Sequence, residues 1–139
     1  MPGGWRVRAT VAVLVLPPLL ELLSFKRIER ALAWLASHGS TPAPGDEAAA
    51  DWVDRALAGK PHPWRHTCLR RATVLYYLLR AAGRPVDLCI GVRRDEHGEL
   101  KAHAWLALTG APYLEPGATL ALLPSYTVIS RFPASVAAA

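Results

Sequence analysis

The strongest constraint on the fold is one apolar segment, residues 63–83, with the sequence PWRHTCLRRATVLYYLLRAAG. Its spacing predicts a helix with apolar side chains on nearly every side. Thr67 can cap the N-terminus, because its hydroxyl can accept a hydrogen bond from a free first-turn amide, and Gly83 with Pro85 supplies the stop signal. The remaining polar stripe consists of Arg70, Thr73, Tyr77 and Arg80. A helix that is apolar nearly all round belongs inside a domain, so the rest of the chain must pack around it.

The chain before this segment predicts further helices. Residues 7–15 form an apolar helix or strand that the proline pair 17–18 ends, and the second proline could also start the next helix, since a first-turn proline loses no hydrogen bond. Leucine and isoleucine then recur at helical spacing as far as about His38. A third helix is predicted for residues 47–58, with Asp46 as its cap.

Beyond the central segment the hydrophobic period changes to that of β-strands. Apolar side chains alternate over residues 86–92 and 102–108, and the polar residues 93–101 between them predict a hairpin. Residues 113–115 are expected to form a short third strand, and 119–123 a fourth. Helices followed by antiparallel strands indicate an α+β fold, with the N-terminal helices and the central helix packed on one side of a small sheet.

Composition and charge narrow the classes of function. A chain of 139 residues is enough for one domain with one core. The net charge is +5, but the arginines are scattered along the sequence, which argues against a nucleic-acid-binding surface. The positive charge could instead attract an acidic peptide or an acidic partner protein. Two cysteines make no disulfide framework, so a reducing cytoplasm is expected. The apolar run 9–20 is too short to span a membrane, which leaves membrane-surface contact and secretion as the alternatives to a soluble protein.

Cys68 is the candidate nucleophile. A thiol at a helix N-terminus faces unpaired amides and the positive end of the helix dipole, and both favour the thiolate. His103 falls on the strand predicted for residues 102–108, and Glu115 on the next strand, where a carboxylate could orient the imidazole. These are the three groups that thiol catalysis requires. The alternatives are an inert buried cysteine, a core histidine bonded to the backbone, and Asp87 as the orienting acid.

Two tryptophans are candidates for shaping the site. The backbone amide of the cysteine is the natural first donor to an oxyanion, and a second donor could be the indole of Trp64 or the side chain of His62 or His66. Trp105 lies on the same strand face as the candidate base and could shield a thiolate–imidazolium pair from water. Both tryptophans could instead serve only in packing.

Histidine and cysteine side chains could instead bind zinc. The candidate ligands are His62, His66, Cys68 and Cys89. The two histidines are four positions apart, but Pro63 lies between them and no helix precedes the cap. The chain also contains no Cys-x-x-Cys pair. We therefore expect no metal ion.

The order of helix cysteine, strand histidine and strand acid resembles the transglutaminase-like superfamily of papain-type thiol enzymes. More closely, the segments CLRRA at 68–72, IGV at 90–92 and AHAW at 102–105, with Gly83 after the first, look like the leader peptidase of lasso-peptide biosynthesis in its stand-alone form. The similarity covers about residues 64–115.

This resemblance implies a cysteine peptidase that removes the leader from a ribosomally made precursor peptide, by acyl transfer to Cys68 and then hydrolysis, with no cofactor. It also implies a separate recognition-element protein that grips the leader, and a lasso cyclase that closes the ring with ATP. Within a single domain, 1–139, the catalytic core would occupy residues 61–125, and we expect the helical, leucine-rich segment 1–60 to dock the partner. The alternative is a transglutaminase-like scaffold that binds a peptide without cutting it.

Overall fold

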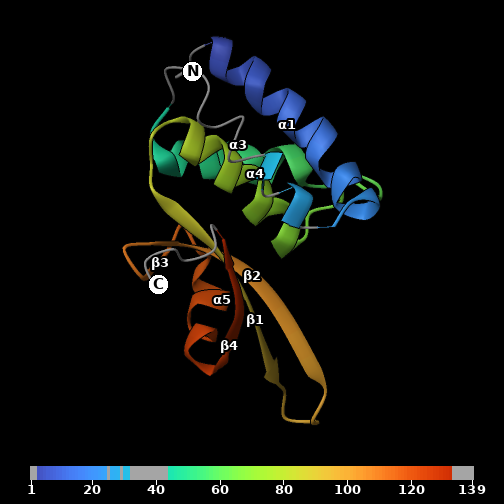
Figure 1. Cartoon of the computed structure of the whole chain (residues 1–139), viewed down its shortest axis with the longest axis vertical. Helices are drawn as coiled ribbons and strands as arrows, with labels where there is room; N and C mark the ends of the chain where they lie inside the picture. The colour runs from blue at the N-terminus through green and yellow to red at the C-terminus, as the bar shows by residue number, and fades with distance from the viewer. Residues whose placement is uncertain (1–2, 25, 29, 32–43, 133–139) are drawn as a thin grey trace.

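The computed structural model describes residues 3–24, 26–28, 30–31 and 44–132. Three helices lie together at one end, and an antiparallel sheet extends from them (Figure 1). The helices are α1 (Gly3–Leu22), α3 (Asp46–Leu57) and α4 (Cys68–Ala81). The strands are β1 (Val86–Arg94), β2 (Leu100–Leu108), β3 (Ala111–Tyr113) and β4 (Thr127–Phe132). The predicted α+β class is confirmed.

The central helix α4 is enclosed by its neighbours. It contacts α1, α3, β1 and β2, and side chains on every side of it are buried. Thr67 caps it as predicted, since its hydroxyl accepts a hydrogen bond from the amide of Arg70 at 3.2 Å. Even the predicted polar stripe turns inward at Arg70 and Thr73, which are 8% and 0% exposed. Buried polar groups need partners, and those of Arg70 include Glu21 at 3.0 Å.

The helix α1 runs unbroken through the proline pair 17–18, so the predicted end there is wrong. Pro18 has no amide to donate to the carbonyl of Leu14 four residues earlier. The indole Nε1 of Trp64 donates to that carbonyl instead, at 2.9 Å, which replaces the missing bond from a distant position in the chain. After α1, residues 26–28 and 30–31 are helical, while the helix end expected near His38 lies outside the described residues.

The helix α3 begins one residue earlier than predicted. Gly45 occupies its cap position, and Asp46 is the first helical residue rather than the cap. The Asp46 carboxylate instead accepts a short hydrogen bond from the hydroxyl of Tyr113, on β3, and pairs with Arg84 at 3.2 Å. This connection ties the edge of the sheet to the helical layer.

The sheet has the order β3-β2-β1-β4. The predicted hairpin is confirmed, with longer strands, and Gly91 lies opposite His103 in its register. The predicted fourth strand at 119–123 is wrong: α5 (Gly117–Leu120) and a 3₁₀ turn (Leu123–Ser125) fill that segment, and the fourth strand is β4. Since β3 and β4 lie at opposite edges, the chain between them must cross one face of the sheet. A short apolar run does not by itself distinguish strand from helix.

The two faces of β2 carry different neighbours. Ala104 and Leu106 pack into the main core with the helices, whereas Trp105 and Ala107 face the crossing segment and pack with Leu123. This alternation is the predicted one.

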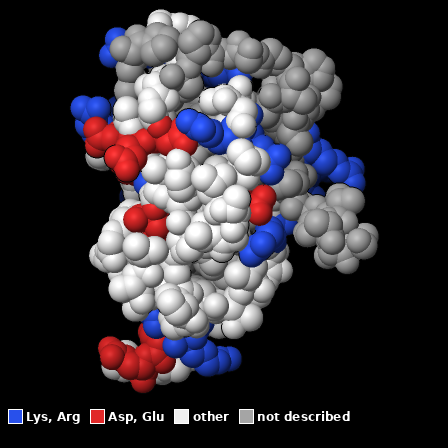
Figure 2. All heavy atoms as spheres, turned by 90° about the vertical axis from the view of Figure 1, so that its left-hand side faces the viewer, with Lys and Arg blue, Asp and Glu red and all other residues white. Residues whose placement is uncertain are grey.

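The surface in Figure 2 is mostly uncharged across its middle, and charged side chains of both signs gather at the hairpin tip at the bottom of the view. At that tip Lys101 pairs with Asp95 and Glu99, so some of the charge is locally neutralised. Within the described ranges, no helix combines the length and apolar character needed to cross a membrane.

Candidate active site

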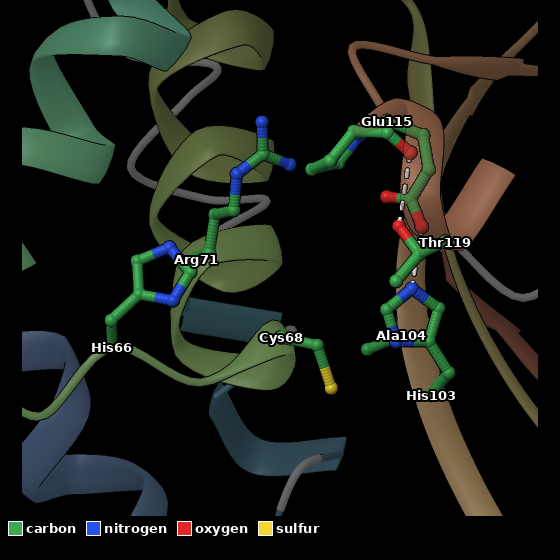
Figure 3. Close-up of a pocket in the computed structure, with 8 residues that line it drawn as sticks. His66, Cys68, Arg71, His103, Ala104, Glu115 and Thr119 are labelled. Carbon is green, nitrogen blue, oxygen red and sulfur yellow. Dashed lines mark hydrogen bonds and ion pairs between the residues drawn. The ribbon is translucent and has the colours of Figure 1, made fainter.

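The structure brings Cys68, His103 and Glu115 together. Cys68 is the first residue of α4 and points toward β2, which carries His103 (Figure 3). Nε2 of His103 lies 2.5 Å from Oε2 of Glu115, just beyond the end of β3. The opposite edge of the imidazole, with Nδ1, is thereby left for the hydrogen bond to the thiol. Cysteine, histidine and carboxylate thus stand in the order that thiol catalysis uses.

The environment favours a thiolate–imidazolium pair. Burial raises the pKa of the Cys68 thiol, but hydrogen bonds from His103 and from the Ala104 amide, with the charge of the imidazolium, outweigh it, and the net shift is downward from 9.0. Hydrogen bonds to Cys68 and Glu115 raise the pKa of His103 from 6.5 to about 10, against the opposing effect of burial. Each partner therefore stabilises the charged form of the other.

Glu115 is well suited to orient the base. Its side chain is 3% exposed, so water competes little for the carboxylate, and that of His103 is 12% exposed. The alternative acid, Asp87, lies further along β1 opposite Ala107 and pairs with Arg80 at 3.5 Å. In this arrangement the orienting group is Glu115.

Arg71 is a site residue that sequence reasoning missed. It lines the pocket from α4, and its Nε donates to Asp54 at 2.7 Å while its Nη2 donates to the carbonyl of Leu114 at 2.8 Å. Leu114 has a positive φ of 59°, a conformation that costs energy for a branched side chain. Arg71 thus holds the turn that presents Glu115. The available signal was the place of Arg71 outside the predicted polar stripe of this helix, because a charge on a buried face requires partners.

The two tryptophans have different places. The Trp64 indole N–H is bonded to α1 and does not line the pocket, so in this arrangement it is not offered to an oxyanion. Trp105, by contrast, stacks beside His103 with ring centroids 5.9 Å apart and an angle of 17°. Tyr126, which the sequence did not single out, lies 5.7 Å from the His103 ring and 5.9 Å from that of Trp105. Together they cover the imidazole on the face away from the helices.

Gly91 makes this stacking possible. A Cβ at that position would lie 2.7 Å from the ring of Trp105 and 3.1 Å from the carbonyl of Thr127. The glycine therefore lets the tryptophan lie across β1 while β4 stays close on the other side.

Of the two histidines named as further oxyanion donors, only His66 lines the pocket. Its Nε2 lies 2.9 Å from Oδ1 of Asp54, whereas His62 contacts Arg70 at 3.2 Å. The pocket has a volume of ≈ 130 Å³. It is lined by His66, Cys68, Arg71, His103, Ala104, Glu115, Pro116 and Thr119. The volume admits a reacting peptide bond and one small side chain, since a water molecule takes about 30 Å³.

The candidate zinc ligands do not form a metal site. No group of three His, Cys, Asp or Glu side chains arranged to hold a metal occurs among the residues that the structure describes. Cys89 is 1% exposed, on the sheet face away from Cys68, and burial raises the pKa of its thiol. Both cysteines are free thiols.

A helix-borne cysteine facing a strand histidine and a carboxylate, on an α+β fold, defines the papain-type class of arrangement. The family model described as the transglutaminase-like superfamily matches residues 12–131, which include Cys68, His103 and Glu115, and the chain belongs to this superfamily. The predicted superfamily is therefore confirmed. Neither the comparison with curated proteins nor that with solved structures finds a match.

Proposed function

We propose that this protein is a cysteine peptidase that removes the leader from a ribosomally made lasso-peptide precursor. The observation that carries the proposal is the alignment of Cys68, His103 and Glu115, with a lowered thiol pKa and a raised imidazole pKa. Membership of the transglutaminase-like superfamily supports thiol chemistry. The CLRRA, IGV and AHAW segments support the leader-peptidase assignment within it.

The geometry suits a two-step acyl transfer. The Cys68 thiolate attacks the carbonyl carbon of the scissile bond, and the Cys68 backbone amide, free at the helix start, can donate to the developing oxyanion. His103 gives its proton to the leaving nitrogen as the C–N bond breaks, which leaves a thioester and a neutral imidazole. Water then attacks the thioester while His103 takes its proton, the C–S bond breaks, and the leader departs as a carboxylate. Glu115 holds the imidazole in place through both steps.

The proposal includes a recognition-element partner that brings the leader to the enzyme, and a lasso cyclase that uses the product. An exposed apolar stripe on α1 supports docking through the N-terminal residues, 1–60. The stripe consists of Val7, Val11, Leu14 and Val15, which are 67%, 53%, 55% and 45% exposed. An unpaired apolar stripe of this kind is typical of a surface that meets another protein.

The test is mass spectrometry of a lasso precursor incubated with the protein, with and without the recognition-element protein. We expect cleavage at one bond, faster with the partner, and lost in Cys68→Ala and His103→Ala. As a matched control, Cys89→Ala removes a thiol that faces away from the site, and it should cleave normally.

The alternative, a scaffold that binds the peptide without cutting it, predicts a different result. The peptide would bind but stay intact under every condition, and Cys68→Ala would bind as well as the unaltered protein. That outcome would replace the peptidase proposal with the scaffold.

A further inference from the structure

One edge of β2 is open beside Cys68. The strand β1 pairs with β2 along its whole length, from Leu100 to Leu108. On the other side, β3 pairs only with the last three residues, and its register ends at Leu106 opposite Tyr113. Within the described ranges no other strand continues this ladder, so residues 100–104 have one unpaired edge. An unpaired strand edge is a template for another extended chain.

Pro112 reveals which backbone groups point to that edge. It lies opposite Ala107 but has no N–H, so the hydrogen-bonded pairs between the two strands must be those of Leu106 and Leu108. Backbone groups of a strand alternate between its two edges. Those of Ala104 and Ala102 therefore point to the same edge as those of Leu106.

The contact between Ala104 and Cys68 independently supports this orientation of the backbone groups. The backbone of Ala104 hydrogen-bonds to the Cys68 thiol, so the amide of Ala104 points past the end of β3 toward the nucleophile. Two residues along the same edge, Ala102 is exposed, and among the described residues no strand pairs with its N–H or C=O there. An extended chain of about four residues fits along this stretch, at about 3.3 Å per residue.

We propose that the substrate binds as an added strand on this edge of β2, with its backbone paired to the N–H and C=O of Ala102 and its reacting carbonyl beside Cys68. The inference rests on the proposed function, since it names how that site holds a peptide. The pocket at Cys68 is small, at ≈ 130 Å³, so pairing of the backbone along the strand edge would add contacts beyond those that the pocket offers.

The first test leaves the protein unaltered. The probe is acetyl-Ala-Ala-Ala-chloromethyl ketone, which alkylates Cys68 and whose small side chains leave binding to the backbone. Three analogues carry an N-methyl group on one alanine each. We expect one analogue to alkylate Cys68 about tenfold more slowly than the parent, because it loses a strand hydrogen bond and its methyl group blocks the edge. Equal rates for the parent and all three analogues would overturn the proposal.

The second test alters the edge. Ala102→Pro removes an N–H that takes no part in the β1 ladder, a position where a strand tolerates proline. The matched control Ala102→Ser keeps the N–H. We expect the proline variant alone to react about tenfold more slowly with the tripeptide probe, while its reaction with iodoacetamide, which needs no strand pairing, stays unchanged. A folded proline variant with the parental tripeptide rate would contradict the proposal, and if that variant does not fold, the N-methyl series decides.

A second copy of this chain is the other possible occupant of the edge. Analytical ultracentrifugation should find a monomer, and a dimer that Ala102→Pro dissociates would overturn the proposal. These readouts do not depend on cleavage. If no precursor is cut but one N-methyl analogue still reacts slowly, the peptidase proposal fails and the binding edge stands; if cleavage occurs and no analogue differs, the binding edge alone fails.

Discussion

At the residue scale, the site depends on two charges that stabilise one another. Burial alone would raise the pKa of the Cys68 thiol, and the hydrogen bonds from His103 and from the backbone, with the charge of the imidazolium, together outweigh that effect. The imidazole in turn owes its raised pKa to Cys68 first and to Glu115 second. The reactivity of the thiol is therefore a property of the pair, since the two protons are coupled.

This coupling predicts the pH dependence of alkylation by iodoacetamide. The Cys68 rate should rise with pH around a midpoint below 9.0, because the folded pKa is lowered. In His103→Ala the midpoint should move upward, since burial then acts without the imidazolium. Peptide mapping by mass spectrometry measures the labelling of Cys68 against pH in the unaltered protein and in His103→Ala.

Cys89 is the internal control for that experiment. Its thiol is buried and its pKa is raised, so at neutral pH it should react at least about tenfold more slowly than Cys68. Equal labelling of the two cysteines in the folded protein would contradict the assignment of Cys68 as the activated thiol.

Gly91 permits a second prediction at this scale. Gly91→Ala places a methyl group 2.7 Å from Trp105, so the ring that stacks beside His103 must shift. We expect a loss of about 1–3 kcal/mol in the free energy of unfolding, measured with urea, and slower alkylation of Cys68. Gly117→Ala is the matched control, because nothing lies within 4 Å of its added Cβ and it should be nearly neutral. A Gly91→Ala protein of parental stability would show that the tryptophan is not held there.

At the scale of elements, the helix α1 and the loop before α4 depend on one bond. The proline pair 17–18 deprives Leu14 of its helical partner, and Trp64 supplies another across the fold. The same loop leads into Cys68, so the bond also anchors the entry to the candidate nucleophile.

Trp64→Phe tests this structural role. It keeps an aromatic ring but removes the N–H, and because this hydrogen bond is exposed, water can take its place at the Leu14 carbonyl. The free energy of unfolding should therefore fall by only about 0.5–1 kcal/mol, the net contribution of one hydrogen bond. Alkylation of Cys68 and peptide cleavage should stay close to the parental rates. Lost cleavage with unchanged stability would instead return Trp64 to the role of oxyanion donor.

At the scale of the whole molecule, the proposed partner surface and the site lie in different regions of the fold. The apolar stripe is on α1, whereas the triad lies between α4 and the sheet. Binding of a partner to the stripe should therefore be separable from the chemistry at Cys68.

Val11→Glu tests that separation. The charge should weaken binding of the recognition-element protein by about tenfold or more, because burying an unpaired carboxylate is costly. Iodoacetamide labelling of Cys68 should not change. Ile129→Glu, on β4, is the matched control, since that side chain is 60% exposed and lies on another element. Binding that is equally strong in both variants, measured by calorimetry, would remove α1 from the partner surface.

The sequence by itself determined the features that depend on near neighbours. The Thr67 cap, the buried central helix, the hairpin and the alternation that puts Trp105 beside His103 all follow from propensities and periods over a few residues. The spacing of Glu115 after His103 predicted that the two would meet, but on adjacent strands; in the structure Glu115 lies beyond the end of β3, in the turn that Arg71 holds.

Only the tertiary structure decided which distant groups satisfy one another. The helix through the proline pair needs Trp64, which is 50 positions from Leu14, and the turn that presents Glu115 needs Arg71, which is 43 positions from Leu114. The fourth strand pairs with β1 at the far edge of the sheet, where no local pattern points. The physical reason is that local preferences act over one or two turns, whereas the partners of buried polar groups and edge strands are chosen by packing of the whole chain.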